Sequence, residues 1–177
     1  MTATLVGTKP LLRASVAHDG RLFAPWILFT TLLSASSVLV YPCVFPTEQD
    51  RAGLAAAIGA NPAIGLIFGP AFDISTTDGF NAWRSLALGG FLAALGVIFA
   101  ITRATRAQED SGQAELLASG VMGRGTRLMA AVAIGLIGSV LLGIVAGLVT
   151  VACGGGWMPS MLLAATFTAT GWMFTGV

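Results

Sequence analysis

The sequence predicts an all-α, polytopic membrane protein with four transmembrane helices, an amphipathic N-terminal segment, an external apolar hairpin and a cytoplasmic helical segment. Of its 177 residues, 55% are hydrophobic and only 10% are charged, and the mean hydropathy is +0.85. Soluble globular chains contain about 25% charged residues. The charges are also clustered and leave four long uncharged intervals. A bilayer core about 30 Å thick needs roughly 20 helical residues, so these intervals are candidate spans.

The first span is expected at residues 22–41, after an amphipathic N-terminal segment at residues 1–21. Proline is tolerated in the opening turn of a helix, which suits Pro25, and Pro42 and Pro46 are expected to close the helix. A cleaved signal peptide is the alternative, because Ser34-Ala35-Ser36 offers small residues. The apolar run continues past these serines, which favours a retained helix.

The second span is expected at residues 85–102, an uncharged run of 18 residues between Arg84 and Arg103. Both arginines can extend toward the interfaces and lengthen its effective reach. Small residues at four-residue spacing favour close helix approach in lipid. Two such pairs occur in the predicted spans: Gly89 with Ala93, and Gly143 with Gly147.

The last uncharged interval is 50 residues long, which is too long for one helix. The glycines at 154–156 are expected to break it into spans at residues 128–153 and 159–177. Because the sequence stops at Val177 inside an apolar stretch, we expect the chain to be incomplete.

The connection at residues 48–84 contains an ambiguous uncharged stretch at residues 52–72. It is apolar but rich in glycine, and Pro62 and Pro70 would each interrupt a helix. We predict an apolar hairpin that lies on or dips into the membrane. A further membrane span is the alternative.

Orientation follows from the lysines and arginines that flank the spans, which are enriched on the cytoplasmic side. Counted along the chain, the four connecting segments carry three, two, four and no cationic residues. This alternation predicts a multi-pass plasma-membrane protein with a cytoplasmic N-terminus, an external loop at 48–84 and a cytoplasmic loop at 103–127. The residues counted are Lys9, Arg13, Arg21, Arg51, Arg84, Arg103, Arg106, Arg124 and Arg127.

Several classes of function are not expected from this sequence. It has no G-x-x-x-x-G-K-[ST] phosphate loop, and its single lysine, Lys9, is followed by proline. A single histidine, His18, gives no metal-ligand cluster and no catalytic residues, so we expect neither a metal site nor an enzyme. A net charge of +1 provides no basic field for nucleic acid. The predicted spans contain no ionisable residue of the kind that drives ion-coupled pumps.

The two cysteines, Cys43 and Cys153, fall near the outer ends of the first and third predicted spans. An external disulfide between them is one interpretation, because the outer compartment is oxidising. The alternative, which the pattern favours, is two buried free cysteines that act as small hydrophobic residues.

The predicted cytoplasmic loop at 103–127 holds the densest polar pattern in the chain. Arg106 lies one helical turn before Glu109, a pairing that supports an exposed helix. After Gly112, the run Glu115-Leu116-Leu117 forms an acidic and apolar element that can dock in a groove of a cytosolic partner. An ordinary solvated loop whose arginines fix the topology is the alternative.

Two blocks of sequence carry a resemblance to a known family. The motif Glu109-Asp-x-Gly112-Gln-x-Glu115-Leu116-Leu117, followed by Gly123-Arg124, resembles the intracellular loop of ABC exporter permeases of the tetronasin or polyketide-antibiotic transport group. The external block from Asn61-Pro62 to Gly69-Pro70, continuing to Gly79-Phe80-Asn-Ala-Trp83, resembles a second stretch of the same group. The resemblance extends over roughly residues 61–127.

The resemblance implies a type 2 ABC exporter permease in which the first cytoplasmic loop forms a coupling helix. Such a helix sits in a cleft of a separate ATPase subunit. Two such subunits are implied, and they would bind ATP and Mg. Family members are about three times this length, so the likeness also implies the remainder of the permease, or a second permease half, as a partner. Gln113 stands where the family pattern has arginine. The contact residues implied are Glu109, Gly112, Gln113, Glu115, Leu116 and Leu117.

The function implied is ATP-driven multidrug efflux, in which a permease moves lipophilic drug-like or antibiotic solutes outward and confers antibiotic resistance. Four arginines at the membrane face would act as the lever between the coupling helix and the spans: Arg103, Arg106, Arg124 and Arg127. Two other classes remain open: a non-transporting membrane scaffold that anchors a cytosolic partner, and a secondary transporter.

Overall fold

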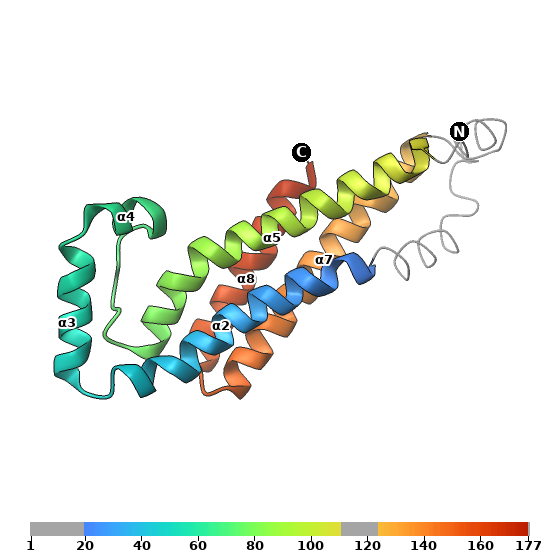
Figure 1. Ribbon diagram of the computed structural model, residues 1–177. Coiled ribbons are helices and arrows are strands. Elements are labelled where there is room, and N and C mark those ends of the chain that lie inside the picture. The colour runs from blue at the N-terminus through green and yellow to red at the C-terminus, as the bar shows by residue number, and fades with distance from the viewer. Residues whose placement is uncertain (1–19, 111–123, 177) are drawn as a thin grey trace.

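The fold is all-α throughout the residues that this computed structural model describes, 20–110 and 124–176 (Figure 1). This confirms the predicted fold class. Short 3-10 turns, η1 and η2, stand at the two ends of the described chain. The elements in order are η1 (Gly20–Phe23), α2 (Ala24–Val44), α3 (Glu48–Gly59), α4 (Pro62–Phe68), α5 (Thr77–Asp110), α7 (Arg124–Ala152), α8 (Trp157–Met173) and η2 (Phe174–Gly176).

Helices α2, α5, α7 and α8 pack into a four-helix bundle in which successive helices run in opposite directions (Figure 1). The two middle helices, α5 and α7, contact each other, and both also contact α2 and α8. Helices α2 and α8 therefore lie on opposite sides of the bundle.

Three helices are long and apolar enough to cross a membrane: Ala24–Val44, Thr77–Arg103 and Ala131–Ala152, with 21, 27 and 22 residues. The bent pair α3 and α4 would make a fourth candidate if it is one broken span. Helix α8 has 17 residues and packs against α5 and α7 in the same bundle. Large hydrophobic side chains remain exposed along the bundle surface, among them Phe29, Phe91 and Leu162. Such a surface suits lipid, so the chain is a membrane protein.

The helix of the first span ends three residues later than the sequence predicted. Helix α2 continues through Pro42 to Val44 and ends before Pro46, so of the two prolines expected to close it, Pro42 lies inside the helix. A proline removes one backbone donor, but here the helix ends only two residues later. The amide of Phe45 still donates to the carbonyl of Tyr41, at 2.9 Å, and completes the last turn.

Helix α5 also begins earlier than predicted, at Thr77 instead of Ser85. The hydroxyl of Thr76 accepts a hydrogen bond from the amide of Gly79, at 3.0 Å, and so caps the new helix end. The carboxylate of Asp78 in the first turn suits the positive end of the helix dipole. Residues 77–84 are therefore helical and do not belong to the loop.

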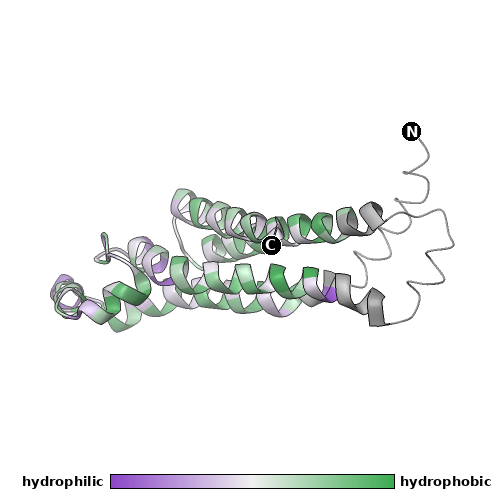
Figure 2. Ribbon diagram, turned by 90° about the horizontal axis from the view of Figure 1, so that it is seen from above, coloured by the Kyte–Doolittle hydropathy of each residue, from purple (hydrophilic) through white to green (hydrophobic). Residues whose placement is uncertain are grey.

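Helices α3 and α4 meet at an angle of 90° and bury none of their residues. Figures 1 and 2 show α3 crossing one end of the bundle at a steep angle to the bundle helices. A capping box between Thr47 and Asp50 begins α3, and hydrogen bonds from Thr47 lower the pKa of the Asp50 carboxyl. The side chain of Asn61 caps α4, with Pro62 in its first turn. The hairpin is thus a bent pair and not one continuous helix.

The hairpin contacts the bundle where the chain leaves α4. The indole Nε1 of Trp83 on α5 donates to the carbonyl of Gly69 at 3.1 Å. The rings of Phe68 and Trp83 lie 5.0 Å apart. Gly69 has a φ of +78°, a backbone conformation that favours glycine, so a residue with a Cβ atom would be strained in this turn.

The predicted small-residue pairs both lie at contacts between helices. A Cβ atom added at Gly143 would lie 2.6 Å from the carbonyl oxygen of Ala164 on α8, and one at Gly147 would lie 2.9 Å from the Ala164 methyl. A Cβ at Gly89 would lie 2.7 Å from the ring of Phe167. Ala93 is buried in the same apolar cluster as Phe167. These glycines allow close approach of α8 to α7 and α5.

Candidate functional site

The predicted coupling segment falls mostly outside the described residues. Glu109 lies in the last turn of α5, which runs without a break to Asp110. The predicted contacts Gly112, Gln113, Glu115, Leu116 and Leu117 lie in the stretch 111–123, which the structure does not describe. Their role as contacts for a partner ATPase stays a prediction.

The four arginines of the predicted lever belong to the two helices that flank this stretch. Arg103 and Arg106 are in the last part of α5, and the Arg103 side chain is exposed. Arg124 and Arg127 are in the first turn of α7. Figures 1 and 2 show these ends of α5 and α7 at the same end of the bundle, opposite the α3–α4 hairpin. All four backbone positions therefore lie at one end of the molecule.

A polar cluster that the sequence analysis missed joins α2, α5 and α7 inside the bundle. Asn81 donates through Nδ2 to the hydroxyl of Ser34 at 3.0 Å, and its Oδ1 accepts from the hydroxyl of Ser85 at 2.8 Å. Thr150 donates to the same Ser34 hydroxyl at 2.8 Å. All four side chains are buried, with at most 2% of their surface exposed. One amide and three hydroxyls therefore link three helices in the buried interior of the bundle.

The sequence contained a signal for the α2 side of this cluster only. Thr30, Ser34, Ser37 and Tyr41 recur at spacings of four, three and four residues, which places them on one face of α2. All four are buried toward the bundle. The sequence analysis searched the spans for ionisable residues only, and hydroxyl and amide groups escaped that search.

Three buried hydroxyls have no hydrogen-bond partner among the described residues. They are Thr30 and Thr31 on α2 and Ser160 on α8. Thr30 is fully buried, and its methyl carbon lies near Gly89 on α5. An unpaired hydroxyl in an apolar interior costs about 1–3 kcal/mol. The interior of the bundle therefore retains hydroxyl groups that are free to form a hydrogen bond.

A carboxylate ties the start of α5 to the turn between α7 and α8. Asp78 accepts hydrogen bonds from the backbone amide of Gly156 at 2.9 and 3.2 Å, one to each oxygen. Gly156 is the N-cap residue of α8 and has no capping side chain of its own. The Asp78 side chain therefore supplies, from another helix, an acceptor for one of the amides at the start of α8 that have no partner within the helix.

Arg84 lies on the boundary between α2 and α5 at the hairpin end of the bundle. Its side chain is half-buried, and Nη1 donates to the hydroxyl of the buried Ser37 at 2.9 Å. The sequence analysis treated Arg84 only as the cation before the second span. The earlier start of α5 instead places it on the second turn of a helix, together with Asn81.

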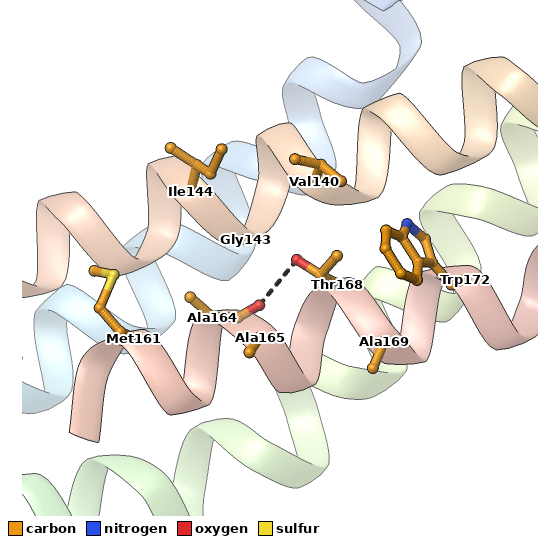
Figure 3. A pocket seen from close by; sticks show the side chains of 9 residues that line it. All are labelled: Val140, Gly143, Ile144, Met161, Ala164, Ala165, Thr168, Ala169 and Trp172. Atoms are coloured by element: carbon orange, nitrogen blue, oxygen red, sulfur yellow. Dashed lines mark hydrogen bonds between the residues drawn. The ribbon is translucent and has the colours of Figure 1, made fainter. Parts of the chain in front are cut away.

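An apolar groove of about 390 Å³ runs along the outer side of α7 and α8 (Figure 3). Met161 and Trp172 lie toward its two ends on α8. The Trp172 ring is held across the groove end by a hydrogen bond from Nε1 to the carbonyl of Leu136 at 3.2 Å. Thr168 is the polar side chain of the lining, and its hydroxyl already donates to the carbonyl of Ala164 at 3.0 Å. The groove thus offers apolar surface and polar atoms that are already paired.

Both cysteines are free thiols, so the structure does not contain the external disulfide considered from the sequence. The thiol of Cys43 donates to the carbonyl of Leu39 on its own helix at 3.4 Å. The alternative of two free cysteines agrees with the structure, but Cys43 is exposed and Cys153 is half-buried within the described residues. Among the described residues, no group of three or more histidine, cysteine or acidic side chains could hold a metal ion.

No protein-family model matches the sequence. The chain is similar to the multidrug efflux system permease protein Rv1217c of Mycobacterium tuberculosis, with 33% identity over 175 residues. The similarity covers 97% of this chain but 31% of the relative, so the chain spans about a third of the length of that protein. The chain is therefore a distant homologue of one part of an efflux permease.

Proposed function

We propose that this chain is the membrane-spanning part of an ATP-driven ABC exporter that moves lipophilic, drug-like solutes outward. ATP would be hydrolysed on separate ATPase subunits, with Mg, and not on this chain. The main support is the similarity to a multidrug efflux permease along 97% of the chain. The membrane-spanning helices support the same class of protein.

The chemistry of the bundle interior favours a neutral or amphipathic cargo over an ion. The described helices carry no charged residue between Ala24 and Val44, between Ser85 and Thr102, or between Ala131 and Ala152. Polar groups inside are hydroxyls and one amide, of which Asn81, Ser34 and Thr150 form the centre. A charged cargo would need an ionic partner within the bilayer, whereas these groups can serve a neutral one.

Coupling would pass through the segment at 109–117. Helix α5 is continuous over 34 residues from Thr77 to Asp110, which is about 50 Å at about 1.5 Å per residue. A displacement of the coupling segment would therefore tilt one rigid rod that contacts the other three helices of the bundle. Arg103, Arg106, Arg124 and Arg127 would fix the two helix ends at the cytoplasmic membrane face. In this proposal the N-terminus is cytoplasmic and the hairpin is external, as the distribution of cationic residues predicts.

The test is reversal of one charge in the coupling segment. Cells that express the permease with its ATPase should lose at least about tenfold of their export of a lipophilic dye when Glu115→Lys is introduced, because the acidic contact becomes repulsive. Glu48→Lys, a reversal on the exposed start of α3, is the matched control and should leave export unchanged. Surface expression of each variant is measured by external labelling.

Two results would contradict the proposal in different ways. Normal export by Glu115→Lys at normal surface expression would remove the coupling role and favour a scaffold. Export that stops with an uncoupler but continues with an inactive ATPase would identify a secondary transporter.

A further inference from the structure

Arg84 is a cation held in a fixed position on the bundle. Its Nη1 donates to the hydroxyl of Ser37 at 2.9 Å, and that hydroxyl donates in turn to the carbonyl of Leu33 at 2.9 Å. Ser37 is 1% exposed, so the guanidinium is anchored to a buried point on α2. A guanidinium has five N–H donors, and the bond to Ser37 uses one of them.

Three aspartates at this end of the bundle form hydrogen bonds with other groups. Asp78 accepts from the amide of Gly156, and Asp50 accepts from Thr47. Asp73 accepts from the hydroxyl of Ser75 at 3.0 Å. Within the described residues, no carboxylate forms an ion pair with Arg84. A half-buried cation without a counter-charge is unfavourable in a low-dielectric surrounding, so the remaining N–H donors favour an external anion.

The depth of Arg84 in the membrane identifies the class of anion. Arg84 and Arg103 are 19 residues apart on one continuous helix, or about 28 Å. The residues between them carry no charge, and this length is close to the thickness of a hydrocarbon core, about 30 Å. Trp83 and Trp157 lie at the same end of the bundle as Arg84, as expected for side chains at the interface. Arg84 therefore lies at the level where lipid phosphates begin.

We propose that Arg84 and Ser37 form a binding site for the phosphate of a membrane phospholipid. The planar guanidinium binds two phosphate oxygens side by side, while Ser37 holds one of its nitrogens against α2. Arg103 is exposed and can reach the opposite headgroup region as a flexible side chain. The difference between the two arginines is that Arg84 is pre-positioned, so it retains one lipid at a defined place between α2 and α5.

The direct test is solid-state NMR of the protein in phospholipid bilayers, in phosphate-free buffer. With arginine labelled by ¹³C and ¹⁵N, the guanidinium of Arg84 should show strong dipolar coupling to ³¹P of the lipid diester, and the signal should disappear in Arg84→Lys. Added inorganic phosphate has a different ³¹P shift. Coupling to inorganic phosphate instead of the diester, or no coupling to either, would overturn the proposal.

A second measurement compares lipid retention after extraction into detergent, counted by native mass spectrometry. Retention of one phospholipid should fall about tenfold in Arg84→Gln and remain at the wild-type level in the matched control Arg103→Gln. Ser37→Ala keeps the cation but removes its anchor, so it should reduce retention by a smaller factor and remains informative if Arg84→Gln does not fold. Equal retention in Arg84→Gln, Ser37→Ala and wild type contradicts a built site.

Discussion

Two contacts within the same bundle hold the helices together by opposite means. Between α7 and α8, Gly143 and Gly147 bring the backbones so close that an added Cβ at either position would overlap Ala164. Between α2, α5 and α7, the helices are joined by hydrogen bonds from Asn81 and Thr150 to the hydroxyl of Ser34. The first contact depends on glycines that have no Cβ atom, and the second depends on hydrogen-bonding side chains.

The difference matters because lipid removes most of the hydrophobic drive between helices. Tight van der Waals contact then becomes a main source of stability, whereas each hydrogen bond between helices contributes only about 0.6 kcal/mol on average. We therefore expect the glycine contact to be the sensitive one. Substitutions in the polar cluster should lower stability less and should mainly alter the relative positions of the three helices.

The largest effect is expected for Gly143→Ala. Its Cβ would lie 2.6 Å from the carbonyl of Ala164, so α7 and α8 must move apart, and we expect a loss of about 2 kcal/mol in the free energy of unfolding. Gly90→Ala is the matched control, because the nearest atom to its Cβ is 3.9 Å away. Unfolding in mixed detergent micelles measures both. Equal losses in the two variants would show that α7 and α8 do not depend on this close approach.

A smaller effect is expected for Asn81→Ala. The change removes both the bond to Ser34 and the acceptor for Ser85, and we expect a loss of about 1 kcal/mol. Thr166→Ala is the control, since this exposed hydroxyl bonds only to the carbonyl of Leu162 on its own helix. The same unfolding measurement applies. A loss no greater than in the control is the result that would argue against the cluster as a link between helices.

The smallest effect is the coupling between Asn81 and Thr150, which both bind the Ser34 hydroxyl. A double-mutant cycle with Asn81→Ala and Thr150→Val should give an interaction energy of about 0.5 kcal/mol, because the two changes remove bonds to one shared group. In the control cycle, Thr166→Ala at an exposed position takes the place of Thr150→Val. It should give no interaction energy with Asn81→Ala. Strict additivity of Asn81→Ala and Thr150→Val contradicts a shared cluster.

The sequence was sufficient to predict helices and their glycine contacts, because both depend on spacing along one chain segment. Gly143 and Gly147 are four residues apart, which is enough to place them on one helix face. Their partner, Ala164, was not predictable, because spacing does not reveal which helices face each other. The polar cluster joins Ser34 to Thr150 across 116 residues, and no local pattern records such a separation.

Helix ends were predicted less well than helices, for reasons that the structure makes plain. Proline marked the end of α2 in the sequence, yet Pro42 is inside the helix because only the final turn loses a donor. The true start of α5 depends on the Thr76 hydroxyl as a cap. Residues 77–84 were not predicted as part of the helix because they contain the charged residues Asp78 and Arg84.

The hairpin of α3 and α4 has a consequence for where this protein tolerates substitution. No residue in either helix is buried, so most substitutions there leave the bundle's stability untouched. The hydrogen bond from Trp83 to Gly69 is made at the far end of this stretch. Substitutions within the hairpin helices should therefore disturb the packing of the bundle less than substitutions at the glycines between α7 and α8.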